Sequence, residues 1–270
     1  MRRRLGLSDV SHSRLRRFLR DTKRRPRVSL PTRAPTSLAV VVPCYSHAAH
    51  LPEMLEGILA QTRAPDEVIF VDDCSPDGTD EILRAFIAAH PRPAGGRMEL
   101  LVNDHNIGQA ASLNRAIAAA SSELIMIQND DDYLMHDAVE AMLGYFAEYR
   151  DVALIGCASV IFGGTEALAA SAKLSEAYAT PDLPLVPQTP EQVPGYRHPN
   201  DINMTHTGSC FYKAAWEAVG GYYSDKRKRV VPFSDRDFQI RMNALFPVAV
   251  ADTPYAFWRH DSSVDRELNS

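Results

Sequence analysis

The chain has 270 residues, of which 45% are hydrophobic and 23% charged, and its formal net charge is -5 at pH 7. This length allows one large α/β domain or two small ones with a filled core. No apolar run approaches the ~20 residues that span a bilayer, and the Arg-rich start lacks the apolar stretch of a secretory signal, so we expect neither.

The charges are unevenly distributed along the chain. Residues 1–36 contain 12 Lys or Arg and only two acidic residues, which leaves 17 basic and 32 acidic residues in the remainder. An acidic body argues against a nucleic-acid-binding core, because phosphate neutralisation needs clustered Lys and Arg. We therefore expect no nucleic-acid partner.

The basic N-terminal segment has two possible interpretations. Leu15, Phe18 and Leu19 can share one face of a short helix whose other face is rich in Arg. Such a segment can lie on an anionic membrane surface, which predicts peripheral membrane contact. A solvated, disordered tail is the alternative. The stretch SLPTRAPTS that follows is typical of a linker.

The four cysteines are widely separated, at Cys44, Cys74, Cys157 and Cys210. They form no CxxC pair of the kind that zinc and redox sites use. We therefore expect the protein to work in a reducing cytoplasm.

From Leu38 onward, short apolar runs alternate with amphipathic segments. The runs predict strands at 38–43, 67–72, 98–103 and 123–128, and the amphipathic segments predict helices at 50–61, 79–90, 109–120 and 136–149. Alternation of this kind is typical of βαβ units in a doubly wound, mostly parallel sheet, so the predicted fold class is α/β.

The second half of the chain is less regular. Residues 163–199 are first Ala-rich and then contain six prolines, too many for a continuous helix or a central strand. We expect a long active-site loop there, with room for a short helix in its Ala-rich part. Structure is predicted to resume at 205–223 and at 234–245, where Ser234 can cap a helix.

Polar residues follow each of the four predicted strands, and the carboxyl ends of parallel strands share one crevice. After the fourth strand come Asn129, Asp130, Asp131 and Asp132. Adjacent carboxylates repel one another, and a hard divalent cation relieves that repulsion, most naturally while bridging to a diphosphate. An acidic turn that caps the next helix is the alternative.

The second acidic cluster, VIFVDDCSPDGTDEIL, places Asp72 and Asp73 at the end of another strand. A carboxylate there can accept a hydrogen bond from a nucleobase imide or amine. Ordinary helix capping after the strand explains the same residues equally well. The phosphatase motif DxDGT does not fit, because Asp73 and Asp77 are four residues apart. The dinucleotide-binding motif GxGxxG is absent after the first strand, where the chain reads VVPCYSHAAH.

Seven motifs together resemble the family 2 glycosyltransferases of GT-A fold. They occur in the family's order between Ser37 and His260: VVPCYSHAAHL, VIFVDDCSPDGTDEIL, NDHNIGQAASLNRAI, IQNDDDY, GGYY, SDRDF and WRH. The resemblance implies a GT-A type α/β fold with a nucleotide-binding half and a less regular acceptor half. It divides the chain into a basic tail and linker (1–36), a nucleotide-sugar-binding half (37–160) and an acceptor-binding and catalytic-base half (161–270).

The resemblance also implies roles for individual residues. Pro43 and Tyr45 match first-strand residues that touch the nucleobase and ribose, and Asp72 and Asp73 match the base-reading carboxylates. The remaining nucleotide-binding positions that it implies are Asn106, Gly108, Asn114 and Asp130.

The motif IQNDDDY is similar to the family's DxD region, which holds manganese or magnesium against the donor diphosphate. Asn129 stands at the first Asp position, so the choice among the three aspartates stays open, and we favour Asp131 and Asp132. His260 matches the late histidine that completes the metal site, with a surface histidine as the alternative.

SDRDF is similar to the segment that supplies the catalytic base of inverting members, which implies that Asp235 is the base. A helix cap is the competing interpretation of this residue. The implied activity is an inverting transfer, of the hexosyltransferase type, from a nucleotide diphosphate donor, by default UDP-linked, to a hydroxyl of a glycan, lipid-linked or small-molecule acceptor. The alternatives are a catalytically silent scaffold in polysaccharide assembly and a sugar-nucleotide nucleotidyltransferase.

Overall fold

The computed structural model describes Phe18, Asp21, Ile202 and residues 28–91, 96–162, 184–195, 204–225 and 234–259. In chain order, its elements are β1 Leu38–Cys44, α2 Leu51–Leu59, β2 Glu67–Asp72, α3 Thr79–Ala89, β3 Arg97–Val102, α4 Gln109–Ala119, β4 Leu124–Ile127, β5 Tyr133–Leu134, α5 Ala138–Glu148, β6 Leu154–Phe162, η2 Pro190–Gly195, β7 Cys210–Tyr212, α7 Lys213–Val219, α8 Ser234–Leu245 and β8 Val248–Arg259. The four predicted strands and the four predicted helices of the first half are thereby confirmed.

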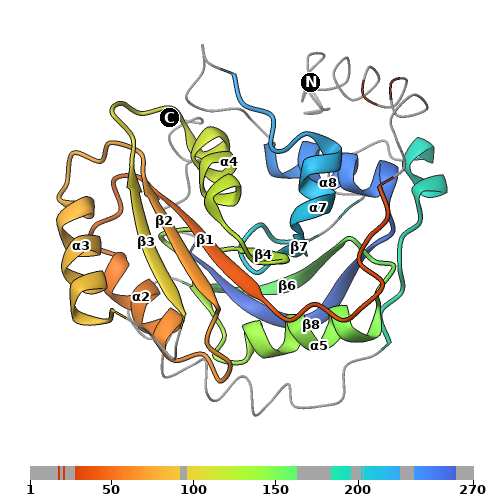
Figure 1. Cartoon of the computed structure of the whole chain (residues 1–270), viewed down its shortest axis with the longest axis horizontal. Helices are drawn as coiled ribbons and strands as arrows, with labels where there is room; N and C mark the ends of the chain where they lie inside the picture. Colours follow the sequence, from red (N-terminus) through yellow and green to blue (C-terminus); the bar gives the residue numbers. More distant parts are fainter. Residues whose placement is uncertain are drawn as a thin grey trace, which may run out of the picture.

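The described strands form one eight-stranded sheet in the order β3-β2-β1-β4-β7-β6-β8-β5 (Figure 1). The pairs β3-β2, β2-β1, β1-β4 and β6-β8 are parallel, and the other neighbours are antiparallel. From β1, the chain moves outward to β2 and β3 and then returns to the other side of β1 as β4. The boundary between β1 and β4 is therefore the point where the strand order reverses, which is where ligands bind in open α/β sheets.

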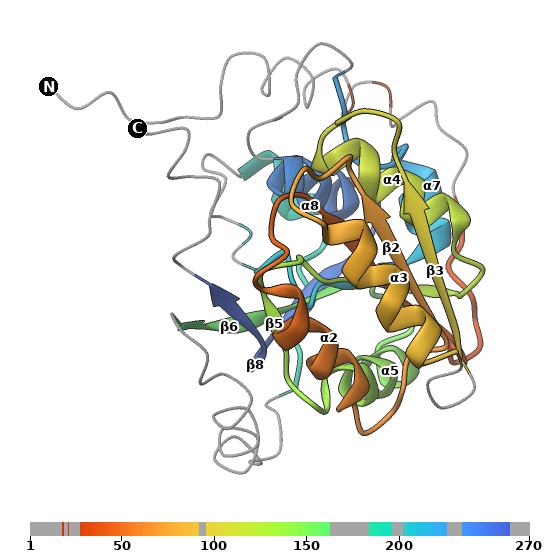
Figure 2. The same ribbon diagram turned by 90° about the vertical axis from the view of Figure 1, so that its left-hand side faces the viewer.

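Helices cover both faces of this sheet. α2, α3 and α5 lie on one side, whereas α4, α7 and α8 lie on the other (Figures 1 and 2). The central strand β1 is buried along its whole length, because it is covered from both sides. This is why it reads as a continuous apolar run without alternation.

The strands β5 to β8 were not predicted from the sequence. β8 contains Thr253 and Pro254, and the pairing of β6 with β8 shifts register around Cys157 and Ala158. Such irregular strands lack the periodic pattern that identifies a strand from its sequence. Of the predicted active-site loop, the structure describes the part that contains η2 and the bridge between Gln188 and Val248, and the Ala-rich part lies outside the described residues.

Phe18 of the basic N-terminal segment packs into the core of the domain. Its side chain is 7% exposed and lies 5.7 Å from the guanidinium carbon of Arg241 on α8. The other two residues of the predicted apolar face, Leu15 and Leu19, lie outside the described residues. Among the helices that the structure describes, none combines the length and apolarity needed to cross a bilayer.

Candidate functional site

Two loops meet where β1 and β4 end. The backbone N–H of Tyr45 donates a hydrogen bond to Oδ2 of Asp130 at 2.9 Å, and Nδ1 of His47 lies 2.9 Å from Oδ1 of the same carboxylate. Ser46 between them has a φ of 59°, a left-handed conformation that turns the chain. The loop after β1 thus wraps around one carboxylate from the loop after β4.

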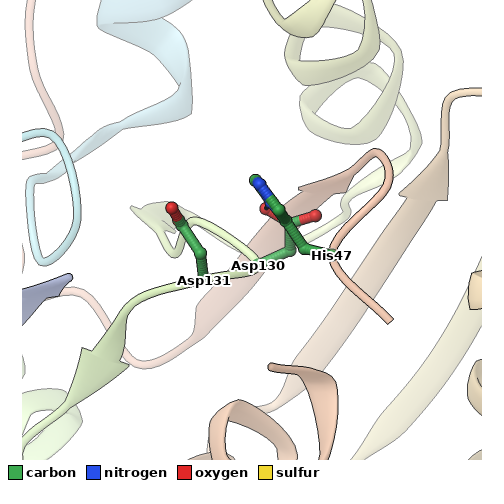
Figure 3. A group of neighbouring side chains, drawn as sticks. All are labelled: His47, Asp130 and Asp131. Carbon is green, nitrogen blue, oxygen red and sulfur yellow. Dashed lines mark hydrogen bonds and ion pairs between the residues drawn. The ribbon is translucent and has the colours of Figure 1, made fainter. Parts of the chain in front are cut away.

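His47, Asp130 and Asp131 form a cluster that fits a metal ion. One ligand atom from each lies within 4.8 Å of the others, and the three side chains point to the same side of the strand ends (Figure 3). Asp130 is 6% and Asp131 9% exposed. Carboxylate oxygens suit Mg²⁺ and Mn²⁺, and an imidazole nitrogen suits transition metals such as Mn²⁺ better than it suits Mg²⁺.

The charges in this cluster depend on one another. The hydrogen bond that His47 donates to Asp130 raises the pKa of His47 to about 9, against the opposing effect of burial. Burial raises the pKa of Asp130, and the hydrogen bond from His47 counteracts it. The two groups thus stabilise each other's charged forms, and a cation bound through Nδ1 of His47 would take the place of the proton on that nitrogen.

The carboxylate of Asp132 faces the protein. Its Oδ2 accepts hydrogen bonds from Oγ1 of Thr207 and from Nδ2 of Asn129 at 2.9 Å, and its Oδ1 accepts one from the N–H of Arg259 at 2.9 Å. Burial and the charge of Asp131 raise the pKa of Asp132 to about 7. Asp132 thus connects the loop after β4 to the turn before β7 and to the end of β8.

Arg259 holds the acidic loop from the opposite side. Its Nε donates to the carbonyl of Asp131 at 2.8 Å, and its Nη2 forms an ion pair with Glu53 on α2. The guanidinium also lies over the ring of Phe162, 4.5 Å from its centre. The predicted ligand His260, the next residue along the chain, lies outside the described residues, and its role and that of Asp132 as metal ligands stay predictions.

Asp73 organises the loop after β3. Its oxygens accept hydrogen bonds from Nδ2 of Asn103 (2.7 Å) and from the backbone N–H groups of Ile107 (2.8 Å) and Gly108 (2.7 Å). Gly108 has a φ of 88°, which favours glycine. Burial raises the pKa of Asp72, whose carboxylate accepts a hydrogen bond from the N–H of Ser75 at 3.2 Å.

The other predicted nucleotide-binding residues have different surroundings. Pro43 is buried in β1 opposite Val71, whereas the Tyr45 side chain just beyond the strand is 41% exposed. Oδ1 of Asn106 is buried without a hydrogen-bond partner among the described residues.

Asn114 on α4 bonds to the segment that follows α7. Its Nδ2 donates to the carbonyl of Tyr222 at 2.8 Å, while its Oδ1 accepts from the N–H of Tyr222 at 2.8 Å and from Nε1 of Trp216 at 3.2 Å. These contacts engage both the nitrogen and the oxygen of the amide and fix the position of Tyr222.

Asp235 lies in the first turn of α8, on the same side of the sheet as α4. Arg236 ties this turn to the segment before β7 by donating to the carbonyls of Ile202 (2.9 Å) and Met204 (2.6 Å). Among the residues that the structure describes, no hydrogen bond or ion pair to the Asp235 carboxylate is found. Asp237, two residues later, is instead buried against Arg241 at 2.8 Å.

Several residues that shape this site were not singled out in the sequence, namely His47, Thr207, Arg259 and Glu53. His47 follows a strand end, as the predicted residues do, and that position was an available signal. Thr207 reaches the acidic loop from the turn before β7, and Arg259 reaches it from the end of β8; the sequence pattern did not show the pairing of these strands.

The chain matches the family model of glycosyl transferase family 2 over residues 39–198, more than half of its length. EpsE of Bacillus subtilis (strain 168) is 25% identical over 192 residues, which are 71% of this chain and 62% of EpsE. The glycosyltransferase GlyG of Streptococcus pneumoniae serotype 4 is 33% identical over 119 residues, 44% of this chain and 38% of GlyG. The chain thus spans less than two thirds of either relative.

Solved structures show the same fold at lower identity. S. aureus TarS aligns with a TM-score of 0.62 and 17% identity over 83% of this chain and 37% of TarS. The mannosyltransferase PcManGT from Pyrobaculum calidifontis, in complex with GDP-Man and Mn²⁺, aligns with a TM-score of 0.60 and 20% identity over 96% of this chain and 67% of PcManGT. The strand order, the acidic loop after β4 and these matches lead to one conclusion: the chain has a GT-A type fold and belongs to glycosyl transferase family 2.

Proposed function

We propose that the protein is an inverting glycosyltransferase that moves a sugar from a nucleotide diphosphate donor to an acceptor hydroxyl. The observation that supports this most directly is the cluster of His47, Asp130 and Asp131 at the β1–β4 boundary of a family 2 chain. TarS structures contain UDP or UDP-GlcNAc, and PcManGT contains GDP-Man and Mn²⁺. We propose residues 37–160 as the donor half and residues 161–270 as the acceptor and base half.

A divalent cation, Mn²⁺ or Mg²⁺, would be held by Asp131 together with Asp130 and His47. Asp132 and His260 remain candidates, and Asp132 would first have to release Thr207 or Arg259. When bound, such an ion neutralises negative charge on the donor diphosphate.

Three features support a donor position beside this cluster. The exposed ring of Tyr45 can stack on the nucleobase. The buried Oδ1 of Asn106 lacks a partner among the described residues and can accept a hydrogen bond from the base or ribose. Gly108 allows the donor to approach the backbone closely. Besides Asn106, Asp72 is a candidate for a hydrogen bond to the base. We take a UDP-linked sugar as the default donor.

Asp235 is the proposed base. Its carboxylate accepts the proton of an acceptor hydroxyl while that oxygen bonds to the anomeric carbon. The bond from this carbon to the diphosphate oxygen breaks on the opposite face, and the nucleoside diphosphate leaves with the electron pair. One displacement of this kind inverts the configuration.

A glycan or lipid-linked acceptor is the proposed second substrate. ExoO of Rhizobium meliloti, 35% identical over 103 residues that make up 38% of this chain and 28% of ExoO, is a succinoglycan biosynthesis protein. The basic N-terminal segment would bring the enzyme to the cytoplasmic face of a membrane. Sedimentation with anionic vesicles, before and after deletion of residues 1–17, tests this contact, and equal sedimentation would argue against it.

A donor screen tests the proposed activity. UDP, GDP, UDP-GlcNAc and GDP-mannose are added with MnCl₂ or EDTA, and both thermal shift and release of nucleoside diphosphate are measured. We expect one nucleotide class to raise the melting temperature with Mn²⁺ only, and its sugar donor to be hydrolysed slowly. If a nucleotide binds but no nucleoside diphosphate is released from its sugar donor, either with water or with any added acceptor, a silent scaffold would be favoured instead.

A further inference from the structure

Residues 204–209 form a turn that joins the metal side of the site to the side of the proposed base. On the metal side, Thr207 donates to Asp132 and accepts the N–H of Asn129 at 3.1 Å, and the N–H of Gly208 donates to Ile127 at 2.9 Å. On the other side, the carbonyl of Met204 accepts from Arg236, the neighbour of Asp235.

His206 lies at the middle of this turn. Its Nε2 is 3.1 Å from the hydroxyl of Tyr222, and the two rings meet edge to face with their centres 5.6 Å apart. The ring is half-buried, and within the described part of the chain Nδ1 has no hydrogen-bond partner. Among the described residues, one ring nitrogen is therefore bonded and the other is not.

Tyr222 is held firmly enough to fix the imidazole. Its backbone N–H and C=O both bond to Asn114, and its ring stacks on Phe238 of α8 at 4.2 Å between centres and 19° between planes. Phe238 lies one turn after Asp235, so the same helix carries the stack and the proposed base.

Asp235 influences both members of the pair electrostatically. Burial lowers the pKa of His206, and the negative charge of Asp235 counteracts that shift. Burial raises the pKa of Tyr222 well above its ordinary value, and the charge of Asp235 raises it further. The charge of Asp235, on the helix whose Phe238 stacks on Tyr222, therefore acts on both rings.

We propose that His206 holds the attacking acceptor oxygen beside Asp235 through Nδ1, while Tyr222 fixes the ring through Nε2. This inference rests on the proposed transferase function and adds a residue that the motifs did not indicate. Either neutral tautomer can hold a hydroxyl, because a hydroxyl both donates and accepts a hydrogen bond. Fixing the attacking oxygen in line with the donor is worth more to turnover than to donor binding.

Two substitutions separate this role from a merely structural one. In His206→Asn, the amide takes the place of Nδ1 and loses the bond to Tyr222. In His206→Gln, the amide reaches the place of Nε2 and keeps that bond while losing the group at Nδ1. The assay uses water as the acceptor and the sugar donor that the donor screen identifies. It measures the release of nucleoside diphosphate in the presence of MnCl₂. The matched control is the same type of substitution, His90→Asn, at the C-terminal end of α3.

We expect His206→Ala to lower kcat by about 10- to 100-fold with the donor dissociation constant unchanged. His206→Asn should recover most of this loss, and His206→Gln should not. Recovery by Gln and not by Asn would overturn the proposal, as would full activity of His206→Ala. Thermal unfolding of each variant shows whether the fold is intact.

The same assay distinguishes failure of the inference from failure of the proposed function. If the unmodified protein turns over no donor, the transferase function itself is wrong. If it does, and Asp235→Asn abolishes turnover while the His206 variants match His90→Asn, only the role of His206 is wrong.

Discussion

His47 and Asp130 are joined at 2.9 Å between Nδ1 and Oδ1, although 83 residues separate them along the chain. One follows β1 and the other follows β4, the two strands between which the strand order reverses. The pair therefore brings an imidazole and a carboxylate to the place where the fold binds ligands.

Asp131→Asn should weaken Mn²⁺ binding in the presence of UDP or GDP by more than about 10-fold, because a carboxylate ligand is replaced by a neutral amide. His47→Ala should also weaken it. Isothermal titration with MnCl₂ measures both. Asp252→Asn, at an exposed position of β8, serves as the control. Unchanged affinity in both site variants would exclude the cluster as the metal site.

Asp132→Asn should reduce stability more than metal affinity. An amide cannot accept from Thr207, Asn129 and Arg259 together, so at least one buried donor loses its partner. We expect the free energy of unfolding to fall by about 1–3 kcal/mol in urea titrations. A stable variant that no longer binds Mn²⁺ would instead identify Asp132 as a ligand.

Asp235→Asn should lower donor turnover by about 10²- to 10⁴-fold and leave donor affinity nearly unchanged, since a base acts in the transition state. Asp237→Asn is the informative comparison. It leaves the buried Arg241 unpaired, so we expect a stability loss of about 3 kcal/mol. If the two variants lost turnover equally while both stayed folded, the assignment of the base would be unsupported.

Glu67 gives a pH dependence that is independent of the site. Burial raises the pKa of Glu67, but hydrogen bonds from Ser122 and Ser121 outweigh burial and leave this pKa below its ordinary value. The folded state thus favours the ionised form, so the contribution is complete above the ordinary pKa and is lost as pH falls through the lowered one.

The stability difference between the unmodified protein and Glu67→Gln should therefore be largest near pH 7 and shrink toward pH 3. Urea unfolding at several pH values measures it. A difference that stays constant over this range would show that the shape of the side chain matters here and its charge does not.

Phe18→Ala should destabilise the domain by about 3 kcal/mol, because a buried aromatic ring is lost from the contact with Arg241. Val28→Ala, at a position that is 38% exposed, should cost much less. Chemical denaturation of the full chain compares them. Equal stability of the two variants would mean that the N-terminal segment does not hold the domain together at Phe18.

The strands β1, β2 and β4 were predictable because they are buried along their whole length. The run predicted at 38–43 is β1, Leu38–Cys44, and the run predicted at 67–72 is β2, Glu67–Asp72. Continuous burial produces unbroken apolar runs with polar residues at their ends. Asp73 and the Asp130–Asp132 group were found from this pattern alone.

By itself, the sequence determined the α/β layer, the acidic residues at its strand ends and the resemblance to the glycosyltransferase family. Only the tertiary structure decided how the acidic residues divide their roles: Asp130 pairs with His47, Asp132 turns toward Thr207 and Arg259, and Asp73 holds the loop at Gly108. A buried strand can be recognised from its sequence, because its burial produces a pattern of apolar residues that are consecutive in the chain. The orientation of a carboxylate depends on donors brought close by β7 and β8, whose pairing over long separations leaves no local pattern in the chain.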